Sequence, residues 1–125
     1  MKRFALIFAM AAACGGSSSN PDAPASIDAK VSSVKSVACT GSEAVTVTVV
    51  GSTQFAFSPM NPSITAGQAI HFNTTSFHPV KSGTPSAPTN DFEVANGDGC
   101  LMFTQAGSFP FFCEVHLFPG TVTVN

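Results

Sequence analysis

The stretch GSFPFFCEVHLFPGTVTV, residues 107–124, contains two extended segments joined by a short connection. Its first part, residues 108–113, is dense in Phe, and its last part, residues 121–124, alternates Thr with Val. Alternation with a period of two is typical of a half-buried β-strand. Between the two segments, Cys113 and His116 place a thiol and an imidazole three residues apart. The stretch therefore predicts two strands with two metal-ligating side chains at the connection between them.

The chain before this stretch also has the pattern of short strands separated by turns. Residues 45–49 alternate Val with Thr, and a long loop with two prolines is expected at residues 81–90. Further strands are expected at residues 54–57, 69–73, 92–94 and 101–104, with turns at 58–62, 66–68, 96–99 and 105–107. No helical stripe longer than a turn is present in this span. The sequence predicts an all-β fold, a Greek-key β-sandwich of seven or eight strands.

The beginning of the chain has a different composition. Residues 1–13 combine a positive start with an apolar run of ten residues, which is typical of an export signal and too short to span a bilayer. Small residues lead directly into Cys14, as in bacterial lipoprotein signals, so we expect lipidation of Cys14 and a location in the periplasm or on the outer membrane or cell surface. An ordinary secretion signal with an incidental Cys is the alternative. Residues 14–38 are expected to form a flexible tether and residues 39–125 the folded domain.

The charge of the chain is low. The formal net charge is −2, with five basic and seven acidic residues in 125. No basic stripe is present, and this argues against nucleic acid as a partner. We expect a monomer that contacts the lipid membrane through Cys14.

A third candidate ligand lies upstream of the Cys113 and His116 pair. His78 follows the expected strand at residues 69–73, in another strand-to-loop segment. Loops of this kind gather at one end of a sandwich, so one thiolate and two imidazoles are expected to converge. A site of two His and one Cys suits copper, because thiolate favours the cuprous ion and imidazole binds both oxidation states. A Cys-x-x-His pair alone would be weak evidence, since such pairs occur by chance.

The context of these residues resembles a known family. Residues 107–116 and the following Gly-x-Val-x-Val segment, residues 120–124, are similar to the signature of the plastocyanin and amicyanin group of cupredoxins. Residues 57–59 and 64–73 resemble the same family's approach to its first His ligand. The resemblance implies a blue (type 1) copper electron carrier and not an enzyme, with one ion held by His78, Cys113 and His116.

The residues near His116 also suggest where a partner would bind. Redox partner proteins are expected to dock near His116, Leu117 and Phe118. An apolar patch is expected around the exposed edge of His116, formed by Leu117, Phe118, Pro119, Pro59 and Pro62. The alternative is that these residues only pack the short loop.

The chain departs from the family pattern at two positions. The family has an axial Met shortly after its second His, whereas Phe118 or Pro119 stands there in this chain. A site without a thioether favours the cupric ion less, so we expect a raised reduction potential. Met60 and Met102 lie outside that loop, and either of them as the axial ligand is the alternative. The second departure is Pro79, which stands where the family usually has a polar residue after the first His and which has no N–H to donate.

The other cysteines follow from these assignments. If Cys14 carries lipid and Cys113 binds metal, Cys39 and Cys100 remain as a disulfide pair, which an exported protein would retain. Two buried free thiols are the alternative. His71 lies between Ile70 and Phe72, so it is expected on the opposite, solvent-facing side of its strand.

Three other functions compete with electron transfer. The missing Met would allow a cupredoxin-like enzyme with an open copper position that binds a small molecule. A copper store or chaperone usually needs Met-rich or His-rich clusters, which this chain lacks. A structural domain without metal would not need all three candidate ligands.

Overall fold

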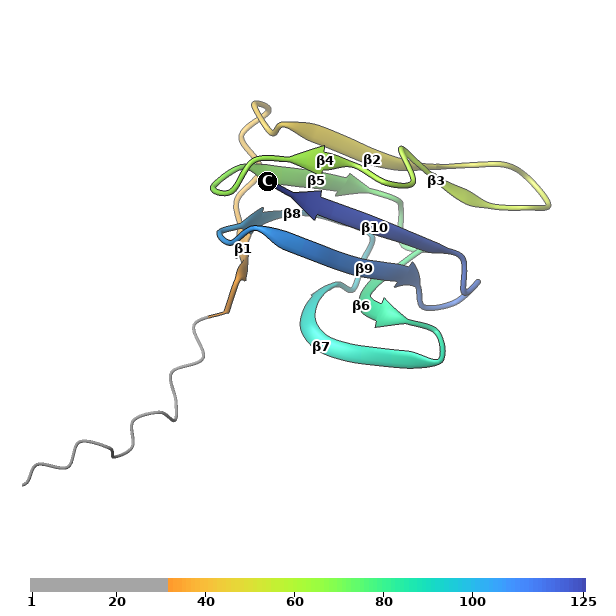
Figure 1. The fold of residues 1–125 in the computed structure, drawn as a ribbon. Coiled ribbons are helices and arrows are strands. Elements are labelled where there is room, and N and C mark those ends of the chain that lie inside the picture. Colours follow the sequence, from red (N-terminus) through yellow and green to blue (C-terminus); the bar gives the residue numbers. More distant parts are fainter. Residues whose placement is uncertain (1–31) are drawn as a thin grey trace, which may run out of the picture. The chain divides into compact units, whose positions relative to one another are not determined.

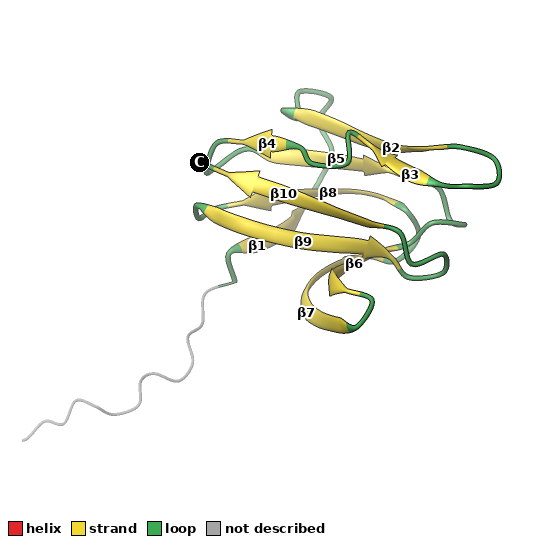
Figure 2. Cartoon of the chain, turned by 45° about the vertical axis from the view of Figure 1, so that its right-hand side comes forward, coloured by secondary structure: helices red, strands yellow, loops and turns green. Residues whose placement is uncertain are grey.

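The computed structural model describes residues 32–125, which form two five-stranded β-sheets (Figures 1 and 2). The first sheet has the order β1-β8-β5-β2-β3 and the second has the order β4-β10-β9-β6-β7. The strands are β1 (Val34–Val37), β2 (Val45–Val50), β3 (Ala56–Ser58), β4 (Ser63–Ile64), β5 (Ala69–Asn73), β6 (Val80–Thr84), β7 (Ala87–Val94), β8 (Asp98–Phe103), β9 (Gly107–Cys113) and β10 (Pro119–Val124). None of these described residues forms a helix that could cross a membrane.

The core lies between the two sheets and is built by the alternation seen in the sequence. Every second side chain of a strand faces inward. Phe72 of β5 meets Phe111 of β9 across the sandwich, with ring centroids 5.3 Å apart, and Phe57 of β3 lies 4.7 Å from Phe111. The all-β sandwich is thus confirmed, with ten strands rather than seven or eight.

The folded domain begins before residue 39, its expected start. Residues 34–37 form β1, which pairs antiparallel with β8, and Val34 is buried in the core. The polar Lys35 and Ser36 interrupt the alternation, so backbone pairing and not side-chain pattern defines this edge strand. The expected signal at residues 1–13, Cys14 and the tether up to residue 31 lie outside the described residues.

The expected loop at residues 81–90 is instead a hairpin of β6 and β7. The pairing register shifts between Lys81 and Gly83, which marks a β-bulge. The Ser82 hydroxyl fills this irregularity, because it accepts the N–H groups of Asp91 and Phe92 at 3.0 and 3.1 Å. Pro88 is tolerated because β7 is an edge strand. Hydrogen bonds from the β7 backbone to the Ser82 side chain thus replace part of the regular ladder at the bulge.

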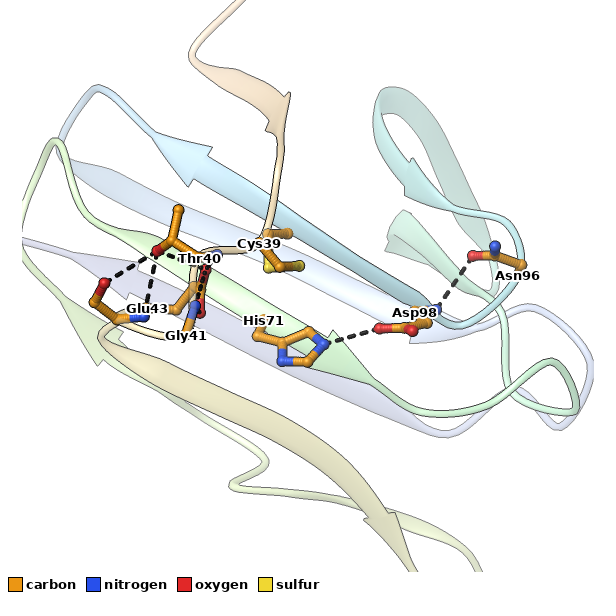
Figure 3. The surroundings of a disulfide bond; sticks show 9 residues. Cys39, Thr40, Gly41, Glu43, His71, Asn96 and Asp98 are labelled. Atoms are coloured by element: carbon orange, nitrogen blue, oxygen red, sulfur yellow. Dashed lines mark hydrogen bonds and ion pairs between the residues drawn. A yellow bond between two sulfur atoms is a disulfide. The ribbon is translucent and has the colours of Figure 1, made fainter.

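A disulfide joins Cys39 to Cys100 on the outer face of the first sheet (Figure 3). Leu101 and Phe103 of β8 are part of the core, whereas Cys100 is bonded on the outer side of this strand. Cys39 follows β1 closely, and the two Cα atoms are 5.3 Å apart. The predicted pairing is confirmed, and the alternative of two free thiols is wrong.

The disulfide closes a long loop, so its removal should destabilise the domain strongly. We expect the double variant C39A/C100A to lose roughly 4 kcal/mol of unfolding free energy in the chain-entropy account, for a separation of 61 residues. Urea unfolding followed by circular dichroism measures this, because the chain has neither Trp nor Tyr for fluorescence. Chemical reduction of the wild-type protein should produce the same loss. A loss below about 1 kcal/mol would contradict the prediction.

Candidate metal centre

Three side chains from two loops meet at one end of the sandwich. His78 lies in the connection from β5 to β6, Cys113 is the last residue of β9, and His116 lies in the connection from β9 to β10. The pairing of β6 with β9 sets Val80 opposite Cys113. The residues just before Val80 therefore lie beside those just after Cys113, which brings the three predicted ligands together.

The distances among these side chains fit a single metal ion. The Cys113 Sγ atom lies 3.7 Å from Nδ1 of His78 and 3.7 Å from Nδ1 of His116. One donor atom from each of the three residues lies within 4.8 Å of the others. With metal–nitrogen and metal–sulfur bonds of about 2.0 and 2.3 Å and an angle near 120°, nitrogen and sulfur would be about 3.7 Å apart. A soft thiolate with two imidazoles is also a donor set that suits copper.

The three donors differ in their exposure to solvent. Cys113 is fully buried and His78 is 8% exposed, whereas His116 is exposed. Burial lowers the pKa of the His78 imidazole below its ordinary value of 6.5, and the charge of a protonated His116 lowers this pKa further. His78 is therefore kept neutral near pH 7, with a nitrogen lone pair free for a metal.

One backbone hydrogen bond ties the two ligand-bearing loops to each other, and another closes the β9–β10 connection. The N–H of Glu114 donates to the carbonyl of Pro79 at 2.9 Å, and the N–H of Cys113 donates to the carbonyl of Phe118 at 2.9 Å. Pro79 has no N–H to donate, but its carbonyl supplies the acceptor for this link. The N–H of His116 also points to the Cys113 sulfur at 3.4 Å.

A second set of hydrogen bonds holds the His78 loop from the other side. The buried Thr74 hydroxyl donates to the carbonyl of His78 at 2.7 Å, and the N–H of His78 donates to the carbonyl of Thr75 at 3.0 Å. The carbonyl of Gly97, in the β7–β8 turn, accepts the N–H groups of Thr74 and Thr75. Sequence reasoning missed Thr74, because only the approach of the β7–β8 turn shows its role.

Aromatic side chains surround the two imidazoles. The ring of Phe118 lies 5.6 Å from that of His78 and 6.5 Å from that of His116, so it packs near both. Pro119 is exposed at the start of β10. Phe55 also contacts both imidazoles, whereas the sequence predicted only that it belongs to a strand at residues 54–57.

The two methionines considered from the sequence take different positions. Met60 is exposed, and its carbonyl accepts the N–H of Thr121. Met102 pairs with Ala69 at the beginning of β5, whereas His78 follows the end of that strand. Met102 is therefore at the opposite end of the strand from the metal centre.

His71 lies on the outer face of the first sheet, as predicted, and is partly covered. Its Nε2 atom pairs with the Asp98 carboxylate at 2.8 Å, and it is the cross-strand neighbour of Cys100 (Figure 3). Cys39, His71 and Cys100 have donor atoms within 4.8 Å of one another, but the two sulfurs are bonded to each other. This group therefore has no free thiolate to offer a metal.

Gly97 should be the most sensitive glycine for the geometry of the His78 loop. Its φ is +73°, and a Cβ at this position would overlap the carbonyl oxygen of Thr75. We expect Gly97→Ala to lose far more stability than the roughly 1 kcal/mol that left-handed backbone alone costs, and to shift the NMR signals of His78. Gly67→Ala is the matched control, because Gly67 has a φ of +95° and open space around it. Equal effects of the two variants would contradict this account.

Comparison with known proteins identifies the architecture. A scan against protein-family models finds no match, and neither does a search of curated proteins. Among solved structures, amicyanin from Paracoccus versutus aligns over 74% of this chain and 98% of its own, with a TM-score of 0.51 and 19% identity. Pseudoazurin from Methylobacterium extorquens AM1 aligns over 65% of this chain and 74% of its own, with a TM-score of 0.52 and 24% identity. The described part of this chain therefore has the cupredoxin fold.

Proposed function

We propose that the domain is a copper-binding one-electron carrier of the blue copper type. The observation that carries the proposal is a buried thiol with two imidazole nitrogens at 3.7 Å, on a cupredoxin fold. His78, Cys113 and His116 would hold one ion. When bound, copper supplies a couple between the cuprous and cupric states.

Each of the three residues has a distinct part in this proposal. Cys113 provides the thiolate from within the core, where the sheet restricts its movement. His78 stays neutral because burial lowers its pKa, and Thr74 holds its backbone. His116 is the exposed member, so its imidazole edge offers a route between the buried thiolate and solvent. Backbone hydrogen bonds fix the two loops, so the ligands would move little when the site gains or loses an electron.

The surface around His116 supports docking of a redox partner protein. Leu117 is 54% exposed and Val115 is 61% exposed, and both flank His116 in the same loop. Phe77, which precedes His78, is 75% exposed and was not anticipated from the sequence. Of the apolar residues expected there, Phe118 is half-buried and Pro62 is buried, so they pack beneath the surface. An apolar surface of this kind suits brief contacts with a partner.

We further propose that the protein is exported and anchored to a membrane by lipid on Cys14. This rests on the export-type run at residues 1–13 and the small residues before Cys14. A domain with a disulfide agrees with an oxidising compartment. The protein would thus act in the periplasm or on the outer membrane or cell surface.

Copper binding should produce an intense visible absorption band from charge transfer between the Cys113 sulfur and the cupric ion. We expect one equivalent of cupric ion to saturate the band in the purified domain. Cys113→Ser should abolish it, whereas His71→Ala, which removes an imidazole outside the centre, should leave it unchanged. A missing band in the wild-type protein, or a band that persists in Cys113→Ser, would refute the proposal.

Lipidation should decide where the full chain is found in a bacterial host. We expect the wild-type protein in the membrane fraction and labelled by a radioactive fatty acid. Cys14→Ser should lose the label and should no longer be retained with the membrane as a mature protein. If Cys14→Ser and wild type fractionate alike and neither is labelled, the signal is an ordinary secretion signal.

A further inference from the structure

The ring of Phe55 covers both imidazoles of the metal centre at once. Its centroid lies 4.7 Å from that of His78 and 4.9 Å from that of His116, while the two imidazoles are 4.8 Å apart. Because these three distances are nearly equal, the Phe55 ring packs against both imidazoles and not against only one of them. Phe55 is half-buried, so one part of it faces the centre and another part faces solvent.

Phe55 lies closer to the imidazoles than Phe118, which stands at the expected fourth position. The corresponding distances for Phe118 are 5.6 and 6.5 Å. Phe118 itself packs against Phe57 at 4.5 Å and is part of the edge of the core. The aromatic ring nearest to the two imidazoles is therefore Phe55, which lies in the β2–β3 connection and not in the loop that carries His116.

The β2–β3 connection sets the position of Phe55. Figures 1 and 2 show this connection at the same end of the sandwich as the β9–β10 connection. The strands pair up to Val50 and Ala56, so five residues must turn the chain. Gly51 has a φ of +105°, and a Cβ on it would overlap the carbonyl oxygen of Gln54. The turn is thus tight, and at its end the Phe55 ring lies against His78 and His116.

The chemistry of the donor set gives this ring a consequence. A copper ion held by two imidazoles and one thiolate, with no thioether after His116, has a position at which water or a small anion could bind. The apolar surroundings of a metal site control solvent access to it. We propose that Phe55 closes the centre to water and small anions, and so keeps it an electron carrier instead of an open, ligand-binding site. This inference rests on the proposed copper binding.

Azide is a suitable probe, because it is a small anion that binds open cupric sites and changes their spectrum. We expect the visible spectrum of the copper-loaded wild-type protein to be unaffected by azide. Phe55→Ala should respond to azide with a saturable spectral change. Phe55→Leu retains apolar bulk, so its affinity for azide should be at least about tenfold lower than that of Phe55→Ala, a difference of about 1.4 kcal/mol. Phe77→Ala is the matched control, since it removes an exposed ring next to His78.

A measurement on the metal-free protein separates failure of this inference from failure of copper binding. The Cys113 thiolate displaces iodide from iodoacetamide, so the alkylation rate reports access to the centre. Cys113 is the free cysteine of the described residues and is fully buried. We expect alkylation to be at least about tenfold faster in Phe55→Ala than in wild type, for a protein whose circular dichroism is unchanged. Phe77→Ala should react at the wild-type rate.

The two measurements assign each result to one claim. A wild-type protein without the charge-transfer band refutes copper binding, while the alkylation result still decides whether Phe55 covers the centre. A normal band combined with azide binding to wild type, or with equal behaviour of Phe55→Ala and Phe77→Ala, overturns the role of Phe55. If Phe55→Ala unfolds, Phe55→Leu decides. A response to azide that wild type lacks, or faster alkylation than wild type, supports the role of Phe55, and wild-type behaviour in both measurements overturns it.

Discussion

The antiparallel pairing of β6 with β9 is the constraint on which the candidate metal centre depends. Val80 lies opposite Cys113, and beyond that pair the N–H of Glu114 still reaches the carbonyl of Pro79. His78 and Cys113 therefore belong to adjacent segments of one continuous ladder, although 35 residues separate them in sequence. A single hydrogen bond contributes only about 1 kcal/mol, so the sheet as a whole, rather than one contact, holds the two loops together.

The centre is an extension of the hydrophobic core and not a separate pocket on its surface. Cys113 belongs to the core cluster, and a series of ring contacts leads from Phe72 through Phe111 and Phe57 to Phe118 beside the imidazoles. Close packing makes such a region resist displacement. The same apolar surroundings lower the pKa of His78, since burial disfavours its charged form. Rigidity and the neutral state of the imidazole thus have one common cause.

The three cysteines of the described residues serve two separate purposes. Cys39 and Cys100 are bonded on the outer face of the first sheet, next to the pair of His71 and Asp98. Cys113 faces inward at the end of the second sheet and remains free. Cys100 of the disulfide and the candidate ligand Cys113 thus lie in different sheets and on different faces. The disulfide and the candidate metal ligands therefore do not compete for partners.

The sequence alone predicted the all-β class from period-two alternation, which is a local property. It predicted the disulfide pair by elimination among four cysteines, and the three converging residues from the Cys-x-x-His pair, the strand-to-loop position of His78 and the family resemblance. It did not show β1, the hairpin at residues 80–94, or the parts played by Thr74 and Phe55. β1 is defined by backbone pairing with β8, and the hairpin depends on a bulge filled by the Ser82 hydroxyl. Thr74 meets Gly97, and Phe55 meets His78 and His116, only when distant turns approach each other. Tertiary structure decided what surrounds the ligands, since contacts between distant segments leave no periodic trace in the sequence.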